Sequence, residues 1–290
     1  MVKLSNQEAW RPWMAFALEA VVLVLMVTAC TAMQVMWGWA GLVLTELLCL
    51  ALAVGVALGH KTPLREVFPL QALSLREAFG GLVFAAATMM LAMLANGISM
   101  VLLPQFFGEF TAIGDFLYVG QSLPVMVLVI AVLPAICEEA LYRGTILSHL
   151  RSLKSEWLVV LIMGAFFGLF HVSVLKFLST AILGGMLSYL MIKRNNLALP
   201  MLTHFLYNLY SVVVGSMSGD VGGSLDAVQS IPALQLIGSY CIISSLAPVL
   251  LVLAARLVDP EGHKGRRWLI GGLCSVALAV TGALCVAASM

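Results

Sequence analysis

Charged residues are scarce in this chain. Only 10% of its 290 residues are Asp, Glu, Lys or Arg, whereas 62% are hydrophobic. A soluble globular domain carries about 25% charged residues, so too few are present here to cover a water-facing surface. Most of the chain must face lipid or other apolar helices, and we predict a membrane protein whose partner is the lipid bilayer. The formal net charge of +1 gives no basis for a nucleic-acid partner, and we predict none.

Paired cysteine motifs are absent as well. The six cysteines lie apart in apolar runs, and no two of them have CxxC spacing. The sequence therefore indicates neither a zinc knuckle nor a redox pair, and we interpret the cysteines as small apolar fillers. We expect no cleavable signal peptide, because the first apolar run is too long and lacks a small-residue cleavage site.

Long apolar runs make up most of the sequence. A bilayer-spanning helix needs about 20 apolar residues, and nine runs reach or approach that length. We predict an all-α, polytopic membrane helix bundle of about nine transmembrane helices, with the N-terminus in the cytoplasm and the C-terminus outside. The predicted helices cover residues 13–36, 39–59, 78–103, 122–150, 156–173, 175–193, 198–216, 232–256 and 268–288.

The distribution of charge sets this orientation, because cytoplasmic segments of membrane proteins are rich in Lys and Arg. The segments that we place outside carry acidic residues instead, and Lys176 is the exception. The basic residues placed inside are Lys3, Arg11, Lys61, Arg65, Arg76, Arg151, Lys154, Lys193, Arg194, Arg256, Lys264, Arg266 and Arg267. The acidic residues placed outside are Glu109, Asp115, Asp220 and Asp226.

Several polar residues fall inside the predicted spans, where a charge costs about 3 kcal/mol and therefore points to function. Glu139 and Arg143 are four residues apart, so they share a helix face and can pair. His204 and Asn208 have the same spacing, as do Phe167 and His171. Glu138 points elsewhere and keeps a free carboxylate. The group of interest is Glu138, Glu139, Arg143, His171, His204 and Asn208.

Helix length predicts where these residues meet. The helices 122–150 and 156–173 are joined by a turn near residues 152–156. Glu138 and His171 are almost equally far from this turn, so at about 1.5 Å per residue they lie at nearly the same depth in the membrane. They match the depth of His204 only if the helices 122–150 and 156–173 protrude on the cytoplasmic side. Two further carboxylates in the predicted spans, Glu19 and Glu46, have either a packing role or a functional one.

This set of side chains supports two kinds of peptide-bond hydrolysis. In one, Glu138 is the general base, His171 helps to hold the water, and His204 and Asn208 stabilise the oxyanion. In the other, Glu138, His171 and His204 bind Zn²⁺, which lowers the pKa of a bound water. Spacing alone does not choose between the two.

Three motifs in this part of the chain resemble those of a known family. Residues 138–143 match EExxxR, residues 167–171 match FxxxH, and residues 204–208 match HxxxN. Their order and spacing are similar to those of the CAAX prenyl protease and bacteriocin-processing (CPBP) intramembrane proteases. The resemblance covers roughly residues 120–215.

The resemblance implies a CPBP-type intramembrane glutamic endopeptidase that acts on a peptide or protein substrate at the membrane. It assigns Glu138 to water activation, His171 to water positioning, and His204 and Asn208 to the oxyanion hole, with Glu139 and Arg143 as structural support. The family has been described both with and without a metal. We predict no cofactor and no metal, with Zn²⁺ on Glu138, His171 and His204 as the alternative.

The implied domains are an N-terminal helical part (1–119), a catalytic core (120–216) and a C-terminal pair of helices (217–290). The compact chain with short loops is typical of a multi-pass protein of a prokaryotic inner or plasma membrane, so we favour membrane-proximal peptides over prenylated proteins as substrates. Two other functions stay open. One is a non-proteolytic scaffold or bacteriocin self-immunity protein, and the other is a proton-coupled transporter, although the inverted repeats common in transporters are absent.

Overall fold

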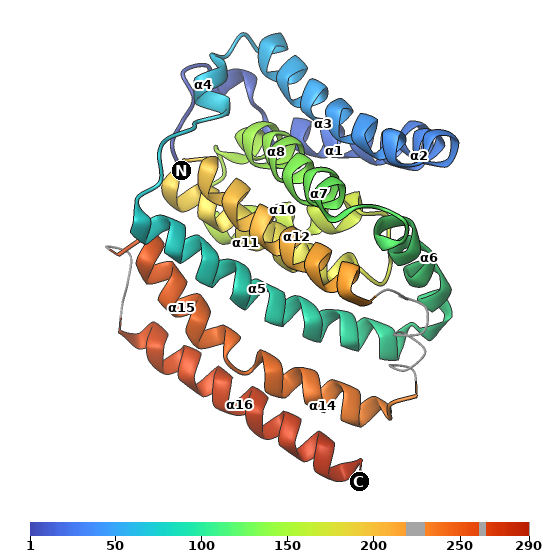
Figure 1. Cartoon of the computed structure of the whole chain (residues 1–290). Coiled ribbons are helices and arrows are strands. Elements are labelled where there is room, and N and C mark those ends of the chain that lie inside the picture. The colour runs from blue at the N-terminus through green and yellow to red at the C-terminus, as the bar shows by residue number, and fades with distance from the viewer. Residues whose placement is uncertain (219–229, 261–264, 290) are drawn as a thin grey trace.

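The computed structural model describes residues 1–218, 230–260 and 265–289. These residues form a layered bundle of helices (Figure 1) and contain no β-strand. The predicted all-α fold is confirmed for the described part of the chain. Asp220, Asp226 and Lys264, which enter the predicted charge pattern, lie outside the described residues.

The N-terminal layer is a helical hairpin followed by a short helix. A π-helical turn, Met26–Cys30, joins α1 to α2, and Gly38, with a φ of +54°, allows the sharp turn into α3. The helices of this layer are α1 (Pro12–Leu25), α2 (Thr31–Trp37), α3 (Trp39–Gly59) and α4 (Leu64–Val67).

The centre of the bundle contains the segment with the three motifs. One continuous helical stretch, Leu123–Leu150, includes two π-helical turns, Val127–Val132 and Ala140–Ile146. The α-helices of the centre are α5 (Leu75–Leu102), α6 (Phe107–Tyr118), α7 (Leu123–Met126), α8 (Leu133–Glu139), α9 (Leu147–Leu150), α10 (Glu156–Phe170), α11 (Phe177–Arg194) and α12 (Ala198–Ser218).

The C-terminal layer lies beyond α5, at the far side of the bundle from α1–α3 (Figure 1). The run predicted as one helix over 232–256 has a break after Ser244, because residues 245 and 246 form a turn before Pro248 begins the next helix. The layer consists of α14 (Ala233–Ser244), α15 (Ala247–Val258) and α16 (Arg266–Ala288).

Each of the nine predicted runs is mostly helical in the described residues, but they do not all have the properties of a spanning helix. Six helical stretches are long and apolar enough to cross a membrane, which makes the chain a multi-pass membrane protein. The predicted total of nine spans, the orientation of the termini and the prokaryotic setting stay predictions. The six stretches are Pro12–Trp37, Trp39–Gly59, Leu75–Leu102, Leu123–Leu150, Ala233–Val258 and Arg266–Ala288.

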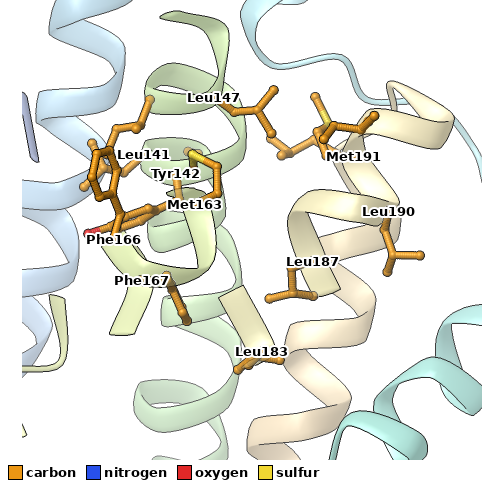
Figure 2. Close-up of a cluster of buried hydrophobic side chains, with 14 of the residues drawn as sticks. Leu141, Tyr142, Leu147, Met163, Phe166, Phe167, Leu183, Leu187, Leu190 and Met191 are labelled. Carbon is orange, nitrogen blue, oxygen red and sulfur yellow. The ribbon is translucent and has the colours of Figure 1, made fainter. Parts of the chain in front are cut away.

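Glycines bring α10 and α11 into close contact. A Cβ atom on Gly164 would lie only 2.8 Å from the backbone oxygen of Ala181, so a larger residue does not fit there. Such small residues let membrane helices approach each other closely. Figure 2 shows the result, a cluster in which Phe167 of α10 and Leu183 and Leu187 of α11 lie close to the helix that carries Leu141 and Tyr142.

The N-terminal segment covers the turn between α9 and α10. The Gln7 side-chain amide donates to the backbone oxygen of Ser148, at 3.3 Å, and Arg151 donates to the backbone oxygen of Val2, at 3.0 Å. Ser148 and Arg151 are both buried. This end of the helical hairpin is therefore covered by the chain itself, and its predicted protrusion into the cytoplasm stays a prediction.

The predicted orientation can be tested with reporters fused to the C-terminus. An odd number of spans puts the two termini on opposite sides, so nine spans predict an active phosphatase fusion and a dark fluorescent-protein fusion in a bacterial host. Insertion of the same reporters after Lys154 is expected to give the reverse pattern. A fluorescent C-terminal fusion would contradict the count of nine.

Candidate functional site

Glu139 is the centre of a buried hydrogen-bond network. Its Oε1 atom accepts a hydrogen bond from Arg143 Nη1, at 2.7 Å, and a second contact of 2.9 Å joins it to His204 Nδ1. Glu139 and Arg143 have no exposed side-chain surface, and His204 is 2% exposed. The pairing predicted from the spacing of Glu139 and Arg143 is present, and the link to His204 ties α12 to the same carboxylate.

Arg143 also joins the motif helix to two other helices. Its Nη2 atom donates to the backbone oxygen of Gly184 in α11, at 2.9 Å. Its guanidinium carbon lies 4.5 Å from the centre of the Phe167 ring in α10, a distance at which a cation is attracted to an aromatic face. The rigid, planar fork of donors in arginine suits this role, because it can serve several partners in fixed directions at once.

Glu138 keeps the free carboxylate that the sequence predicts. The residue is buried, and its Oε2 atom has no hydrogen-bond partner among the described residues. The same atom lies 3.9 Å from His204 Nε2. Glu138 and Glu139 therefore face the two different nitrogens of one imidazole, with Glu139 bonded to it and Glu138 beyond hydrogen-bonding distance.

The predicted helix over 156–173 would include His171, but in the structure His171 lies just outside the helix. Helix α10 ends at Phe170, and His171 is the capping residue that follows. Its Nδ1 atom lies 2.9 Å from the backbone oxygen of Phe167, one of the carbonyls that a helix end leaves without a partner. The ring remains beside Phe167, with the ring centres 4.9 Å apart, so the predicted aromatic contact is confirmed.

Asn208 is held by one of the π-helical turns. Its Nδ2 atom donates to the backbone oxygen of Ile130, at 3.1 Å, within the turn Val127–Val132. A side-chain amide nitrogen carries two hydrogens, so this bond leaves one donor for another partner. The contact fixes the amide on the same face of α12 as His204.

The π-helical turn Ala140–Ile146 begins directly after the two glutamates and contains Arg143. Such wide turns are rare in proteins, and those that occur are frequently found at functional sites. Helical spacing gave the correct partner for Glu139, but nothing in the sequence pattern indicated the π-helical turn.

Two buried carboxylates outside the motifs, Glu19 and Glu46, come from the helices packed around this one. The Tyr142 hydroxyl contacts Glu19 Oε2 in α1, at 3.1 Å, and the Tyr142 ring packs edge-on against Phe167, with the ring centres 5.1 Å apart. Glu19 thus has a packing contact. Glu46, from the layer that packs on α8, is 3% exposed, and its Oε2 atom has no hydrogen-bond partner among the described residues.

The described residues include no group of three or more His, Cys, Asp or Glu side chains that could hold a metal ion. The alternative with Zn²⁺ on Glu138, His171 and His204 and the metal-free alternative both stay predictions.

Comparison with known protein families gives a match in the centre of the chain. Residues 120–210 match the family model described as Rce1-like, type II CAAX prenyl endopeptidase Rce1-like. This stretch, which we call the Rce1-like core, is similar to that family. The match bears out the CPBP resemblance, and it implies protease activity in a membrane protein. No curated protein and no solved structure matches the chain.

The Rce1-like core, residues 120–210, includes every motif residue described above. Its helices supply the whole Glu139 network, whereas Glu19 and Glu46 come from flanking helices. The family match and the site geometry therefore point to the same part of the chain.

The buried pair is expected to dominate the stability of the core. Arg143→Gln leaves the Glu139 charge without its cation, and breaking a buried pair in this way costs about 3–5 kcal/mol. We expect a clear fall in the thermal unfolding midpoint of the detergent-purified protein.

Lys193→Gln is the matched control. It removes a partly exposed ion pair with Glu156, at 2.6 Å, and such pairs contribute up to about 1 kcal/mol. Equal losses of stability in the two variants would contradict a special role for the Glu139–Arg143 pair.

Proposed function

We propose that the Rce1-like core is an intramembrane endopeptidase that uses Glu138 to activate water. The observation that carries this proposal is the buried, unbonded carboxylate oxygen of Glu138, 3.9 Å from His204 Nε2. Glu139 Oε1 is already held by Arg143 and His204, although Glu139 Oε2 has no hydrogen-bond partner among the described residues either. We assign the water to Glu138 because its carboxylate is not tied to Arg143 and lies next to the other nitrogen of His204.

In the proposed reaction Glu138 takes a proton from water, and the hydroxide attacks the carbonyl carbon of the substrate. As the tetrahedral intermediate collapses, the C–N bond breaks and Glu138 returns the proton to the leaving nitrogen. One carboxylate then serves first as base and then as acid, which leaves the enzyme unchanged at the end of the cycle.

His171 is proposed to orient the water. When its Nδ1 carries the hydrogen and donates to the Phe167 carbonyl, its Nε2 is an acceptor. An acceptor at this position can hold one hydrogen of the water while Glu138 takes the other. The capping contact at the end of α10 would therefore select the tautomer that the reaction needs.

Asn208 and His204 are proposed to stabilise the oxyanion. Asn208 keeps one amide hydrogen beyond its bond to Ile130. His204 donates from Nδ1 to the Glu139 carboxylate, so its Nε2 can donate to the oxyanion when the imidazole is protonated on both nitrogens. Each donor in such a site is worth about 10²–10³ in rate. Both donors come from one face of α12, which sets their spacing.

For the substrate we propose a peptide or protein segment at the membrane. The family description names CAAX prenyl endopeptidases, whereas the short loops of this chain favour membrane-proximal peptides without a prenyl group. Cleavage of one peptide with and without a farnesylated cysteine separates these substrate classes.

Loss of the base is expected to abolish cleavage. Glu138→Gln keeps the size of the side chain but removes the acceptor of the proton, so cleavage of a fluorogenic peptide library by the purified protein should fall about 10²–10⁴-fold. The wild-type rate should not change with a zinc chelator. Loss of activity with chelator and recovery with Zn²⁺ would contradict the metal-free reaction, and full activity of Glu138→Gln would contradict the proposed role of Glu138.

The oxyanion donors should affect turnover more than substrate binding. Asn208→Ala is expected to lower kcat about 10²–10³-fold with little change in KM, because the donor acts on charge that develops in the transition state. Ser211→Ala, one turn further along α12, is the control and should leave kcat unchanged. A rise in KM at constant kcat would show that Asn208 binds the substrate instead.

A further inference from the structure

A second feature of the molecule is an apolar groove of about 600 Å³ that none of the motif residues lines. Its walls come from α10, α11, α5 and α15, and Arg267 at the start of α16 is the charged side chain among the described residues that line it. The volume is in the range of about 300–1,000 Å³ that holds small molecules. The groove thus has room for a ligand that is mostly hydrocarbon.

The groove opens toward the surroundings of the bundle. Trp157 and Leu161, both on its wall, are 67% and 69% exposed. The wall residues of α11 extend from Phe177 to Tyr189, which corresponds to about 18 Å of helix. One leaflet of the hydrocarbon core, half of a thickness of about 30 Å, is about 15 Å deep. The groove therefore has the length of a lipid acyl chain in one leaflet.

Polar and aromatic groups gather at one end of the groove. The rings of Trp157 and Tyr189 stack with centres 6.0 Å apart, and both residues line the groove together with Arg267. Lys193 Nζ lies 5.8 Å from the centre of the Tyr189 ring and is paired with Glu156. Trp and Tyr favour the level of the lipid headgroups, and basic residues there attract anionic lipids.

We propose that this groove binds one anionic phospholipid of the bilayer, with an acyl chain along α11 and the headgroup phosphate on Arg267. The apolar walls suit the acyl chain of such a lipid, and the Arg267 guanidinium among the lining residues suits its phosphate. A guanidinium is well suited to phosphate, which it can bind through two parallel hydrogen bonds.

The prenyl chain of a substrate fits the groove less well. On the site side of α11, the backbone oxygen of Gly184 accepts from Arg143, and Gly184 packs against Phe167. Gly185, the next residue, lines the groove. If the prenyl chain of a substrate were held in the groove, α10 and α11 would lie between that chain and Glu138. The bond that a CAAX protease cleaves lies next to the prenylated cysteine, so this binding mode would keep the bond away from Glu138.

Native mass spectrometry of the full-length, detergent-purified protein tests this proposal. The probes are phosphatidylglycerol and phosphatidylcholine with identical acyl chains. We expect the wild type to retain one phosphatidylglycerol in preference to phosphatidylcholine. Arg267→Gln should weaken phosphatidylglycerol binding by about tenfold or more, because it removes the charge and the paired hydrogen bonds that the guanidinium can give the phosphate. Ala165→Phe, at an exposed position on the groove wall, should prevent binding of both lipids.

Two variants are matched controls. Arg266→Gln removes the same charge from an exposed neighbour that does not line the groove, and Ala51→Phe adds the same ring to an exposed position of α3. Both should bind like the wild type. Equal retention of the two lipids by the wild type, retention of neither, or unchanged binding by Arg267→Gln would overturn the proposal. Displacement of phosphatidylglycerol by a farnesylated peptide would assign the groove to a prenyl chain instead.

Discussion

The buried pair of Glu139 and Arg143 is the interaction on which the rest of the core depends. Two charges in an apolar bundle are best tolerated when they are close together and form further hydrogen bonds. Here Arg143 bonds to Glu139 and to the Gly184 carbonyl, and Glu139 also contacts His204. One pair therefore fixes α8, α11 and α12 relative to one another.

The position of Glu138 follows from this arrangement. Adjacent residues of a helix point about 100° apart, so the bonds of Glu139 also set the direction of the neighbouring carboxylate. That direction brings Glu138 to within 3.9 Å of His204 Nε2 while it stays unbonded. The two glutamates of the motif thus have different environments. Glu139 is tied through Oε1 to Arg143 and His204, whereas Glu138 Oε2 lies near His204 without bonding to it.

Residues outside the Rce1-like core hold its motif helix in place. Tyr142 reaches Glu19 in α1, Arg151 reaches the backbone of Val2, and Thr145 donates to the backbone oxygen of Ala53 in α3. The C-terminal helices α15 and α16 form one wall of the apolar groove. The flanking helices thus contribute to packing around the core, although the motif residues themselves come from residues 120–210.

Much of this could be predicted from the sequence, because the signals are local. Apolar runs gave the nine helical segments, and four-residue spacing gave the pairing of Glu139 with Arg143. Contacts between separate helices could not be predicted, since spacing carries no information about which helices are neighbours. The bond of His204 to Glu139 is one example. The break after Ser244, the π-helical turns and the end of α10 before His171 depend on packing and on local backbone hydrogen bonds, which hydrophobic periodicity does not report.

The central claim is that Glu138, His204 and Asn208 surround the reacting carbonyl. The most direct test is an experimental structure of the protein with a peptide phosphonate, which mimics the tetrahedral intermediate. The account predicts one phosphonate oxygen about 2.7–3.1 Å from Asn208 Nδ2 and His204 Nε2, and another oxygen next to the Glu138 carboxylate. A phosphonate bound away from these three side chains, or held by a metal ion on Glu138 and the two histidines, would contradict it.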